Sequence, residues 1–282
     1  MIQEKAYAKL NLTLGVLYKR TDGYHALDSL MVTVDLCDLI TIEKAKEVDV
    51  ITEGAVLPFE NTMYKAASLY KQLTGKGALI RCKKRLPSEA GMGGGSADAA
   101  AVLRGLDRLY HMATADELAK IALRVGADVP FCLHGGLCRC EGVGEVLTPV
   151  PCPELHFCIV KPERGVSTGA LFRALPLPRP RVQTLRAMEL LATGRVTEAA
   201  ALFENALEAP AAALVPEIGE AREALLECGA LASRMTGSGS AVFGLFSEAG
   251  AARKAAEALG ERYAYTAVAK TAGPIFARNA KD

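Results

Sequence analysis

The sequence lacks an excess of charge of either sign, and this makes two classes of partner improbable. Its 282 residues include 33 Lys and Arg against 32 Asp and Glu, which leaves a formal net charge of +1. Attraction to nucleic acid or to an anionic membrane surface needs a strong basic surplus. We therefore expect neither partner, and any phosphate group must be held by a local arrangement of residues.

Long apolar runs are also missing. Residues 1–5 lead directly into a strand-like pattern, without the apolar stretch of a signal peptide. The run at 97–103 contains Asp98 and is followed by Arg104, so it falls short of the roughly 20 apolar residues that cross a bilayer. We expect a cytoplasmic protein that has no membrane segment.

Paired cysteine ligands are absent as well, although the chain has 8 cysteines. Cys138 and Cys140, with Cys132 nearby, allow two interpretations, a metal cluster or thiols packed in the core. A structural zinc site normally shows a Cys-x-x-Cys pair and a matching second pair. Because neither is present and reduced cysteine is common in cores, packing is the favoured interpretation.

The composition is that of a compact globular protein, with 50% hydrophobic and 23% charged residues. Strand-like and helix-like segments are mixed along the chain, which predicts an α+β fold. Pro149, Pro151 and Pro153 mark a shift in composition. We place a domain boundary there, giving domains at 1–150 and 151–282.

Two local patterns locate polar groups on predicted elements. Apolar side chains at 10, 12, 14 and 16 alternate with Lys9, Asn11 and Thr13, which predicts a half-buried strand with one polar face. Thr114 and Glu117 form a capping-box pattern for a helix that ends at Gly126. Asp128 follows immediately, where it is either a turn residue or a functional carboxylate.

A second predicted helix begins at Asn61, a good N-cap residue. Its apolar stripe is expected to run from Met63 to Leu73, through 66, 67 and 70.

The glycine-rich run at 91–96 is the strongest chemical signal. Small residues let a backbone approach a ligand closely, and the helical spacing that follows predicts a helix starting near Ser96 whose free amides face the same point. That combination predicts an anion site. The run is not a Walker A loop, because no Lys-Ser or Lys-Thr follows the glycines, and its spacing fits the dinucleotide fingerprint poorly. Taken by itself, it could also be a flexible turn.

Residues 87–100 closely resemble the Pro-x-x-x-Gly-Leu-Gly-Gly-Gly-Ser-Ser-Asn-Ala-Ala motif of the GHMP kinases, and two further motifs of that family occur in order at 8–12 and 235–241. The resemblance implies a two-domain GHMP kinase architecture. Its N-terminal domain would resemble ribosomal protein S5 domain 2, its C-terminal domain would be ferredoxin-like, and the active site would lie in the cleft between them. Departures from the motif include Met92, Ala97 and Asp98.

The same resemblance assigns roles to residues. Lys9 and Asp128 would be catalytic, with ATP and Mg²⁺ as cofactors. Ser96 would contact the metal, since Ala97 lacks the hydroxyl usual at its position. The residues implied for ATP binding are Pro87, Ser88, Glu89, Ala90, Gly91, Met92, Gly93, Gly94, Gly95, Ser96 and Asn61.

Within the family, residues 20–27 and 126–131 are most like those of kinases whose alcohol acceptor carries a cytidine diphosphate group and that serve isoprenoid biosynthesis. Tyr24 and His25 would hold the cytosine. The other residues implied for the acceptor are Asn11, Thr168, Phe172, Thr236, Gly237 and Ser238. The alternatives are a sister kinase acting on homoserine or mevalonate, a catalytically silent nucleotide sensor, and a dinucleotide-dependent oxidoreductase.

Overall fold

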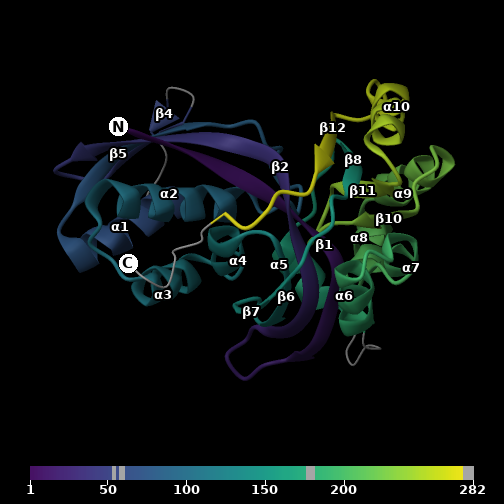
Figure 1. The fold of residues 1–282 in the computed structure, drawn as a ribbon, viewed down its shortest axis with the longest axis horizontal. Coiled ribbons are helices and arrows are strands. Elements are labelled where there is room, and N and C mark those ends of the chain that lie inside the picture. The colour runs from purple at the N-terminus through teal and green to yellow at the C-terminus, as the bar shows by residue number, and fades with distance from the viewer. Residues whose placement is uncertain (53–54, 57–60, 176–181, 276–282) are drawn as a thin grey trace.

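The computed structural model describes residues 1–52, 55–56, 61–175 and 182–275. Two long strands, β1 (Ile2–Lys19) and β2 (His25–Ala45), pair antiparallel and run through the middle of the molecule (Figure 1). They belong to an 8-stranded sheet with the path β4-β3-β5-β2-β1-β9, in which β6 also pairs with β2 and β7 with β6. Its other strands are β3 (Asp49–Thr52), β4 (Ala55–Val56), β5 (Gly77–Lys83), β6 (Leu137–Gly142), β7 (Val146–Val150) and β9 (Glu204–Asn205).

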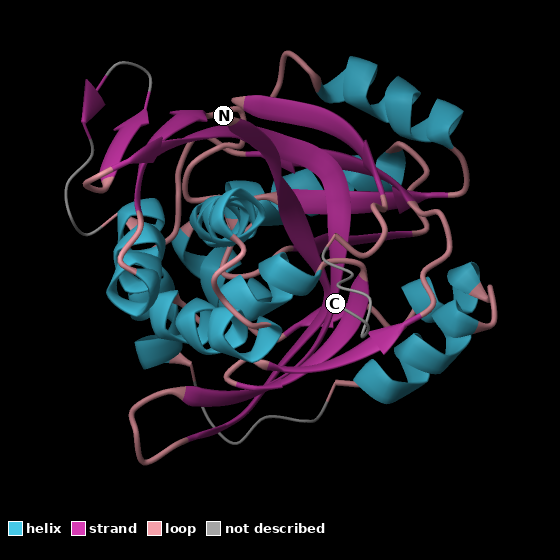
Figure 2. Ribbon diagram, turned by 60° about the vertical axis from the view of Figure 1, so that its left-hand side comes forward, coloured by secondary structure: helices cyan, strands magenta, loops and turns pink. Residues whose placement is uncertain are grey.

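Helices cover one face of this sheet (Figure 2). They are α1 (Thr62–Thr74), α2 (Gly94–Tyr110), α3 (Ala115–Val125) and α4 (Val129–His134). Helix α2 is buried along most of its length, and its Leu103 and Leu106 share one apolar cluster with Ile40 and Ile42 of β2. This burial holds the N-terminus of α2, and the glycine run before it, in a fixed place against β1.

The second sheet has four antiparallel strands in the order β10-β11-β8-β12. They are β8 (His156–Lys161), β10 (Ala232–Met235), β11 (Val242–Phe246) and β12 (Tyr265–Lys270). The remaining helices are α5 (Thr168–Ala174), α6 (Thr184–Ala192), α7 (Val196–Ala200), α8 (Glu208–Leu214), α9 (Glu217–Glu227) and α10 (Ala249–Leu259). The sequence β8, α9, β10, β11, α10, β12 follows the β-α-β-β-α-β order of a ferredoxin-like fold.

The prediction of a half-buried β1 is wrong, because both of its faces are buried. Leu10 and Leu12 share an apolar cluster with Phe157 of β8 and Phe243 of β11, so the second sheet packs on this face. On the other face Lys9, Asn11 and Thr13 are only 3%, 1% and 0% exposed. Strand alternation separated the two faces correctly, but it carries no information about what covers the polar one.

The predicted N-terminal caps of two helices are confirmed. Asn61 caps α1 by accepting a hydrogen bond from the Met63 amide, and Thr114 and Glu117 form the capping box of α3. One detail is wrong, because Leu73 is 45% exposed and takes no part in the buried stripe of α1. Helix α2 begins at Gly94, two residues from Ser96, near which the sequence predicted its start.

The two halves of the chain are interlocked. A boundary between 150 and 151 falls in the link between β7 and β8, yet β9 from the later half pairs with β1 of the first sheet. Near the C-terminus, the Ala272 amide also donates to the carbonyl of Thr33 in β2.

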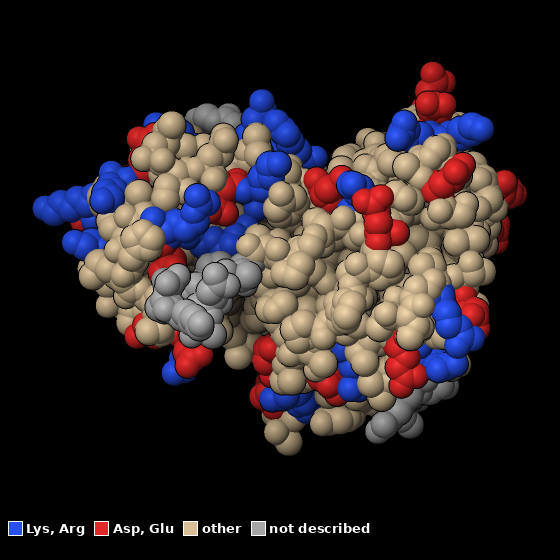
Figure 3. Space-filling model, in the orientation of Figure 1, with Lys and Arg blue, Asp and Glu red and all other residues tan. Residues whose placement is uncertain are grey.

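The surface of the molecule mixes charges of both signs. On the face shown in Figure 3, Lys and Arg gather at the end of the molecule that contains β5 and are interspersed with Asp and Glu elsewhere. In the part of the chain that the structure describes, every helix is too short or too polar to cross a membrane.

Candidate active site

A cavity of about 1240 Å³ collects most of the residues that the sequence singled out. Its wall is built from β1, the start of β2, the glycine-rich run before α2, the start of α5 and the loop at 237–239. The predicted residues that line it are Lys9, Asn11, Tyr24, His25, all of 87–96, Asp128, Thr168, Phe172, Gly237 and Ser238.

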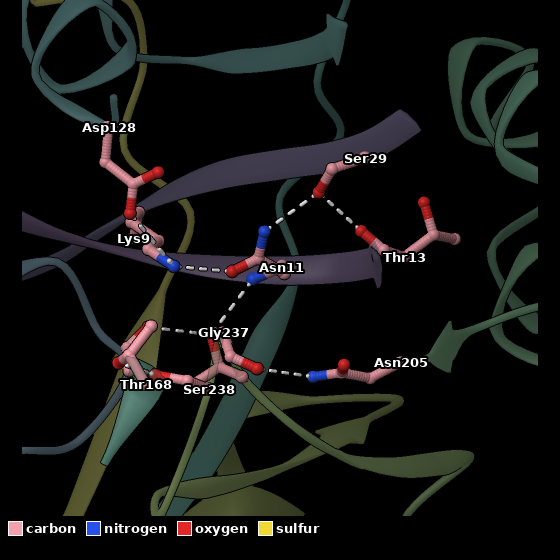
Figure 4. Close-up of polar contacts among 11 residues, drawn as sticks. Lys9, Asn11, Thr13, Ser29, Asp128, Thr168, Asn205, Gly237 and Ser238 are labelled. Carbon is pink, nitrogen blue, oxygen red and sulfur yellow. Dashed lines mark hydrogen bonds and ion pairs between the residues drawn. The ribbon is translucent and has the colours of Figure 1, made fainter. Parts of the chain in front are cut away.

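Lys9 and Asp128 meet in this cavity (Figure 4). The Lys9 Nζ lies 3.6 Å from Asp128 Oδ2 and 2.5 Å from Asn11 Oδ1. The Lys9 side chain is 4% exposed, whereas that of Asp128 is 32% exposed and accessible from the cavity. An alcohol oxygen that enters beside Asp128 can therefore approach both a cation and a carboxylate.

Asp128 occupies the N-cap position of α4, but its carboxylate accepts no capping hydrogen bond from that helix. Only its backbone carbonyl takes part in the helix, accepting from the Cys132 amide. The interpretation of Asp128 as a simple turn or cap residue therefore does not account for its side chain, which faces Lys9 instead. Pro130 in the first turn of α4 stiffens the backbone that presents it.

The glycine-rich run forms a loop that ends in the N-terminus of α2. The amides of Gly94, Gly95 and Ser96 belong to the first turn, where no carbonyl of the preceding turn can satisfy them. All three residues line the cavity, so these amides and the positive end of the helix dipole favour an anion there. The predicted anion site thus has the expected local geometry.

Gly91 is required for a different reason. Its φ is +68°, and a Cβ there would lie 2.1 Å from the carbonyl oxygen of Thr236. A second loop, after β10, is thus packed directly on the first. Backbone bonds hold the two together, because the amides of Ser240 and Ala241 donate to the carbonyls of Glu89 and Ala90.

The second loop contacts the start of α5 at the cavity wall. The hydroxyls of Ser238 and Thr168 lie 2.6 Å apart, within hydrogen-bond distance. Behind the loop, Asn205 of β9 donates to the carbonyls of Met235 and Gly237, at 2.7 and 2.8 Å. These two hydrogen bonds hold the loop in place at the cavity wall.

An aromatic pair lies at the start of β2. The rings of His25 and Phe172 stack with centroids 4.9 Å apart and an interplanar angle of 29°. Tyr24 is 61% exposed beside them and also lines the cavity. Burial, and to a smaller extent the charge of Lys19, lowers the pKa of His25 below its ordinary value of 6.5. The imidazole is therefore neutral at physiological pH, with one donor and one acceptor nitrogen.

Comparison with known proteins decides the family. The GHMP kinases N terminal domain family matches residues 61–136, and the GHMP kinases C terminal family matches residues 187–264. A 4-diphosphocytidyl-2-C-methyl-D-erythritol kinase from Caldicellulosiruptor saccharolyticus is 43% identical over 265 residues, which is 90% of this chain and 91% of that protein. The chain belongs to the GHMP kinase family.

Other GHMP kinases extend this result. A relative of the same name from Cereibacter sphaeroides (strain KD131 / KCTC 12085) is 43% identical, over 93% of this chain and 96% of that protein. The crystal structure of a 4-(cytidine 5'-diphospho)-2C-methyl-D-erythritol kinase superposes with a TM-score of 0.82 at 36% identity, covering 96% of this chain and all of that one. A homoserine kinase from Cytophaga hutchinsonii shares the fold, with a TM-score of 0.74 at 21% identity over 96% of this chain and 95% of that one. The predicted α+β GHMP kinase architecture is confirmed.

Two predicted residues of this GHMP kinase lie outside the cavity wall. Asn61 uses its side chain to cap α1, while its neighbour Thr62 lines the cavity instead. Thr236 is fully buried, and its hydroxyl accepts a hydrogen bond from the backbone N–H of Asn11 at 3.0 Å. Thr236 can therefore affect a ligand only indirectly, by fixing the loop at 237–239.

Sequence reasoning missed several cations at the cavity, namely Lys19, Lys84 and Arg173. Lys84 lies between two carboxylates, 2.5 Å from Asp38 Oδ2 and 2.7 Å from Asp98 Oδ2. Burial raises the pKa of Asp98 to about 7, and it outweighs the opposing effect of Lys84. The only available signal was the basic run at 83–85, which resembles any solvated surface patch.

Proposed function

We propose that this GHMP kinase transfers the γ-phosphoryl group of ATP to the 2-hydroxyl of 4-diphosphocytidyl-2-C-methyl-D-erythritol, a step of the methylerythritol phosphate pathway of isoprenoid biosynthesis. The observation that carries the proposal is one cavity that holds both the Lys9 and Asp128 pair and the stacked His25 and Phe172 rings. Relatives named for this substrate align along nine-tenths of the chain or more, at 43% identity.

The loop at 87–96 is proposed to hold the phosphates of ATP through the first-turn amides of α2. Mg²⁺ would supply neutralisation of phosphate charge, and Ser96 is proposed as its protein contact. The described residues contain no group of three or more His, Cys, Asp or Glu that could hold a metal. One hydroxyl without a carboxylate cluster fits a Mg²⁺ ion that is bound mainly by nucleotide phosphates and water.

At the acceptor end, the base would lie against Tyr24 and the pair of His25 and Phe172. Asn11, Thr168 and the loop at 236–238 are proposed to contact the rest of the acceptor, with Thr236 acting by fixing that loop. The acceptor hydroxyl would then lie beside Asp128. As the alcohol oxygen bonds to the γ-phosphorus, the bond from that phosphorus to the bridging oxygen of ADP breaks and ADP leaves. The Asp128 carboxylate accepts the hydroxyl proton, and the Lys9 ammonium stabilises negative charge on the attacking oxygen and the transferred group.

The direct test is a coupled ADP-release assay on the purified protein with the cytidyl substrate, homoserine and mevalonate, each at saturating ATP. We expect turnover with the cytidyl substrate that exceeds both others by orders of magnitude. Turnover with homoserine or mevalonate alone would replace this proposal with that of a sister kinase. ATP binding without turnover on any of the three would favour a nucleotide sensor.

For the phosphate loop, we expect Gly94→Val to weaken ATP binding at least tenfold. A Cβ at Gly94 would meet Lys84 Nζ and the Leu86 side chain only at ordinary contact distances, 3.6 and 3.8 Å, so the fold should tolerate it. The branches of valine, however, would occupy the space through which phosphate reaches the helix amides. Isothermal titration calorimetry with a non-hydrolysable ATP analogue measures the effect.

The matched control is Gly219→Val, because Gly219 also lies in a helix and has no heavy atom within 4 Å of its Cβ position. It should leave the Kd for nucleotide unchanged. An unaltered Kd in a folded Gly94→Val variant would mean that the loop does not hold the phosphates.

For the base, we expect Tyr24→Ala and His25→Ala to raise the KM for the cytidyl substrate by different routes. Stacking of an aromatic ring on a base contributes about 1–3 kcal/mol with little regard for which base it is. The neutral His25 can instead form hydrogen bonds to the edge of cytosine. A different base would leave these polar groups of His25 unpaired, and the site would therefore reject it. His25→Ala should therefore narrow the preference over a uridyl analogue, whereas Tyr24→Ala should preserve it.

Initial rates with each acceptor at saturating ATP provide this comparison. Both variants should keep the KM for ATP of the wild type. A selective loss of ATP affinity in His25→Ala would place the adenine, rather than the cytosine, at the aromatic pair.

A further inference from the structure

Ser29 lies behind the catalytic pair, on β2, and is fully buried. It is not part of the cavity wall, and neither its neighbours in sequence nor its residue type suggested a role. Its hydroxyl nevertheless continues a chain of hydrogen bonds that begins at Lys9 and passes through Asn11 (Figure 4).

This chain has a defined direction. The Ser29 hydroxyl donates to the Thr13 carbonyl at 2.6 Å. A carbonyl oxygen can only accept, so the single proton of Ser29 is committed there and its Oγ is left to accept. The Asn11 Nδ2, 2.8 Å away, must then be the donor to Ser29. As a result Asn11 Oδ1, the acceptor, faces the Lys9 ammonium.

The orientation of the Asn11 side-chain amide matters because Lys9 has a second possible acceptor, the carboxylate of Asp128. Its Nζ is 2.5 Å from Asn11 Oδ1 but 3.6 Å from Asp128 Oδ2. An amide turned the other way would present its NH₂ group to the ammonium, placing donor against donor. Lys9 would then lose this acceptor and could close on Asp128, occupying the oxygen that must receive the proton of the acceptor hydroxyl.

We propose that Ser29 is a positioning residue, which fixes the side-chain amide of Asn11 so that Lys9 Nζ stays bonded to Asn11 and 3.6 Å from Asp128 Oδ2 rather than closing on that oxygen. The inference rests on the proposed roles of Lys9 and Asp128. It concerns how these two are kept in place, whatever alcohol the enzyme phosphorylates.

The test compares Ser29→Ala with Thr184→Val. Thr184 is equally buried, and its hydroxyl lies 3.0 Å from that of Thr13, at the far end of the same polar network. Loss of a buried hydrogen-bond partner corresponds to about tenfold in an equilibrium or rate. We expect Ser29→Ala to lower kcat about tenfold and to leave the KM for ATP unchanged. Thr184→Val should lower the Tm by a similar amount to Ser29→Ala but should keep the kcat of the wild type.

A double-mutant cycle separates positioning from general destabilisation. In an Asn11→Ala background Ser29→Ala should cause no further loss of kcat, because it acts only through Asn11. Equal effects in both backgrounds, or a folded Ser29→Ala variant with the kcat of the wild type, would overturn the proposal. If Ser29→Ala does not fold, Ser29→Cys preserves the packing, and its weakly accepting sulfur should still reduce kcat when Asn11 is present but not in the Asn11→Ala background.

The assay uses any acceptor that supports wild-type turnover in the ADP-release panel. Failure of the cytidyl substrate would therefore reject the proposed function but leave the Ser29 cycle to be decided on homoserine or mevalonate. Conversely, an additive cycle on the cytidyl substrate would reject only the role of Ser29.

Discussion

Asp128→Asn is expected to remove most of kcat, by about 10²–10⁴-fold, the usual contribution of a general base. The amide preserves the shape of the carboxylate but cannot accept the proton of the attacking hydroxyl. Because the Asp128 side chain is 32% exposed and caps no helix, the substitution should leave the Tm and the Kd for ATP close to those of the wild type. Single-turnover and steady-state rates with the preferred acceptor measure the loss.

Asp116→Asn provides the control, since Asp116 is an exposed carboxylate in the first turn of α3. It should keep the kcat of the wild type. If Asp128→Asn retained half of that kcat, the carboxylate would not be the base, and positioning of the two substrates would have to account for the rate.

Lys9→Met is expected to lower kcat by about 10²–10³-fold, the effect of removing one preorganised charge-stabilising group from an active site. Methionine has a similar length but carries no charge to stabilise the attacking oxygen and the transferred phosphoryl group. The substitution also leaves Asn11 Oδ1 without its donor, which costs about 1–3 kcal/mol when the acceptor stays buried. A lower Tm is therefore expected together with the loss of rate.

The two effects separate in the kinetics. A purely structural salt bridge would show the lower Tm but an unaltered kcat below the melting range, and that result would reject a catalytic role for Lys9. Lys120→Met, at an exposed position of α3, should change neither quantity.

Features that depend on neighbouring residues were accessible from the sequence. The N-cap at Asn61 and the capping box at Thr114 and Glu117 are made within one turn, so their residue types alone predict them. The glycine run and the start of α2 are local in the same way, and the predicted start lies within two residues of the observed one. Likewise, the composition and the ordered motifs indicated the family and the fold class.

Features that depend on contacts distant in sequence could not be predicted. The polar face of β1 is buried because the loop before α2, the loop after β10 and the start of α6 contact Lys9, Asn11 and Thr13 respectively, and alternation within one strand does not reveal such a cover. Lys84 could not be distinguished from a surface lysine until Asp38 and Asp98 were seen on either side of it.

The residues at 8–12, 87–100 and 235–241 by themselves indicated the GHMP kinase family and predicted an anion site at the start of a helix, because each motif is a short run whose residue types can be recognised without knowing the fold. Only the tertiary structure decided how that chemistry is arranged. It brought Asp128 to within 3.6 Å of Lys9, stacked His25 on Phe172, and placed Ser29 where its single proton orients Asn11. Hydrogen bonds and charge pairs act over a few ångströms of space, and separation along the chain does not specify that distance.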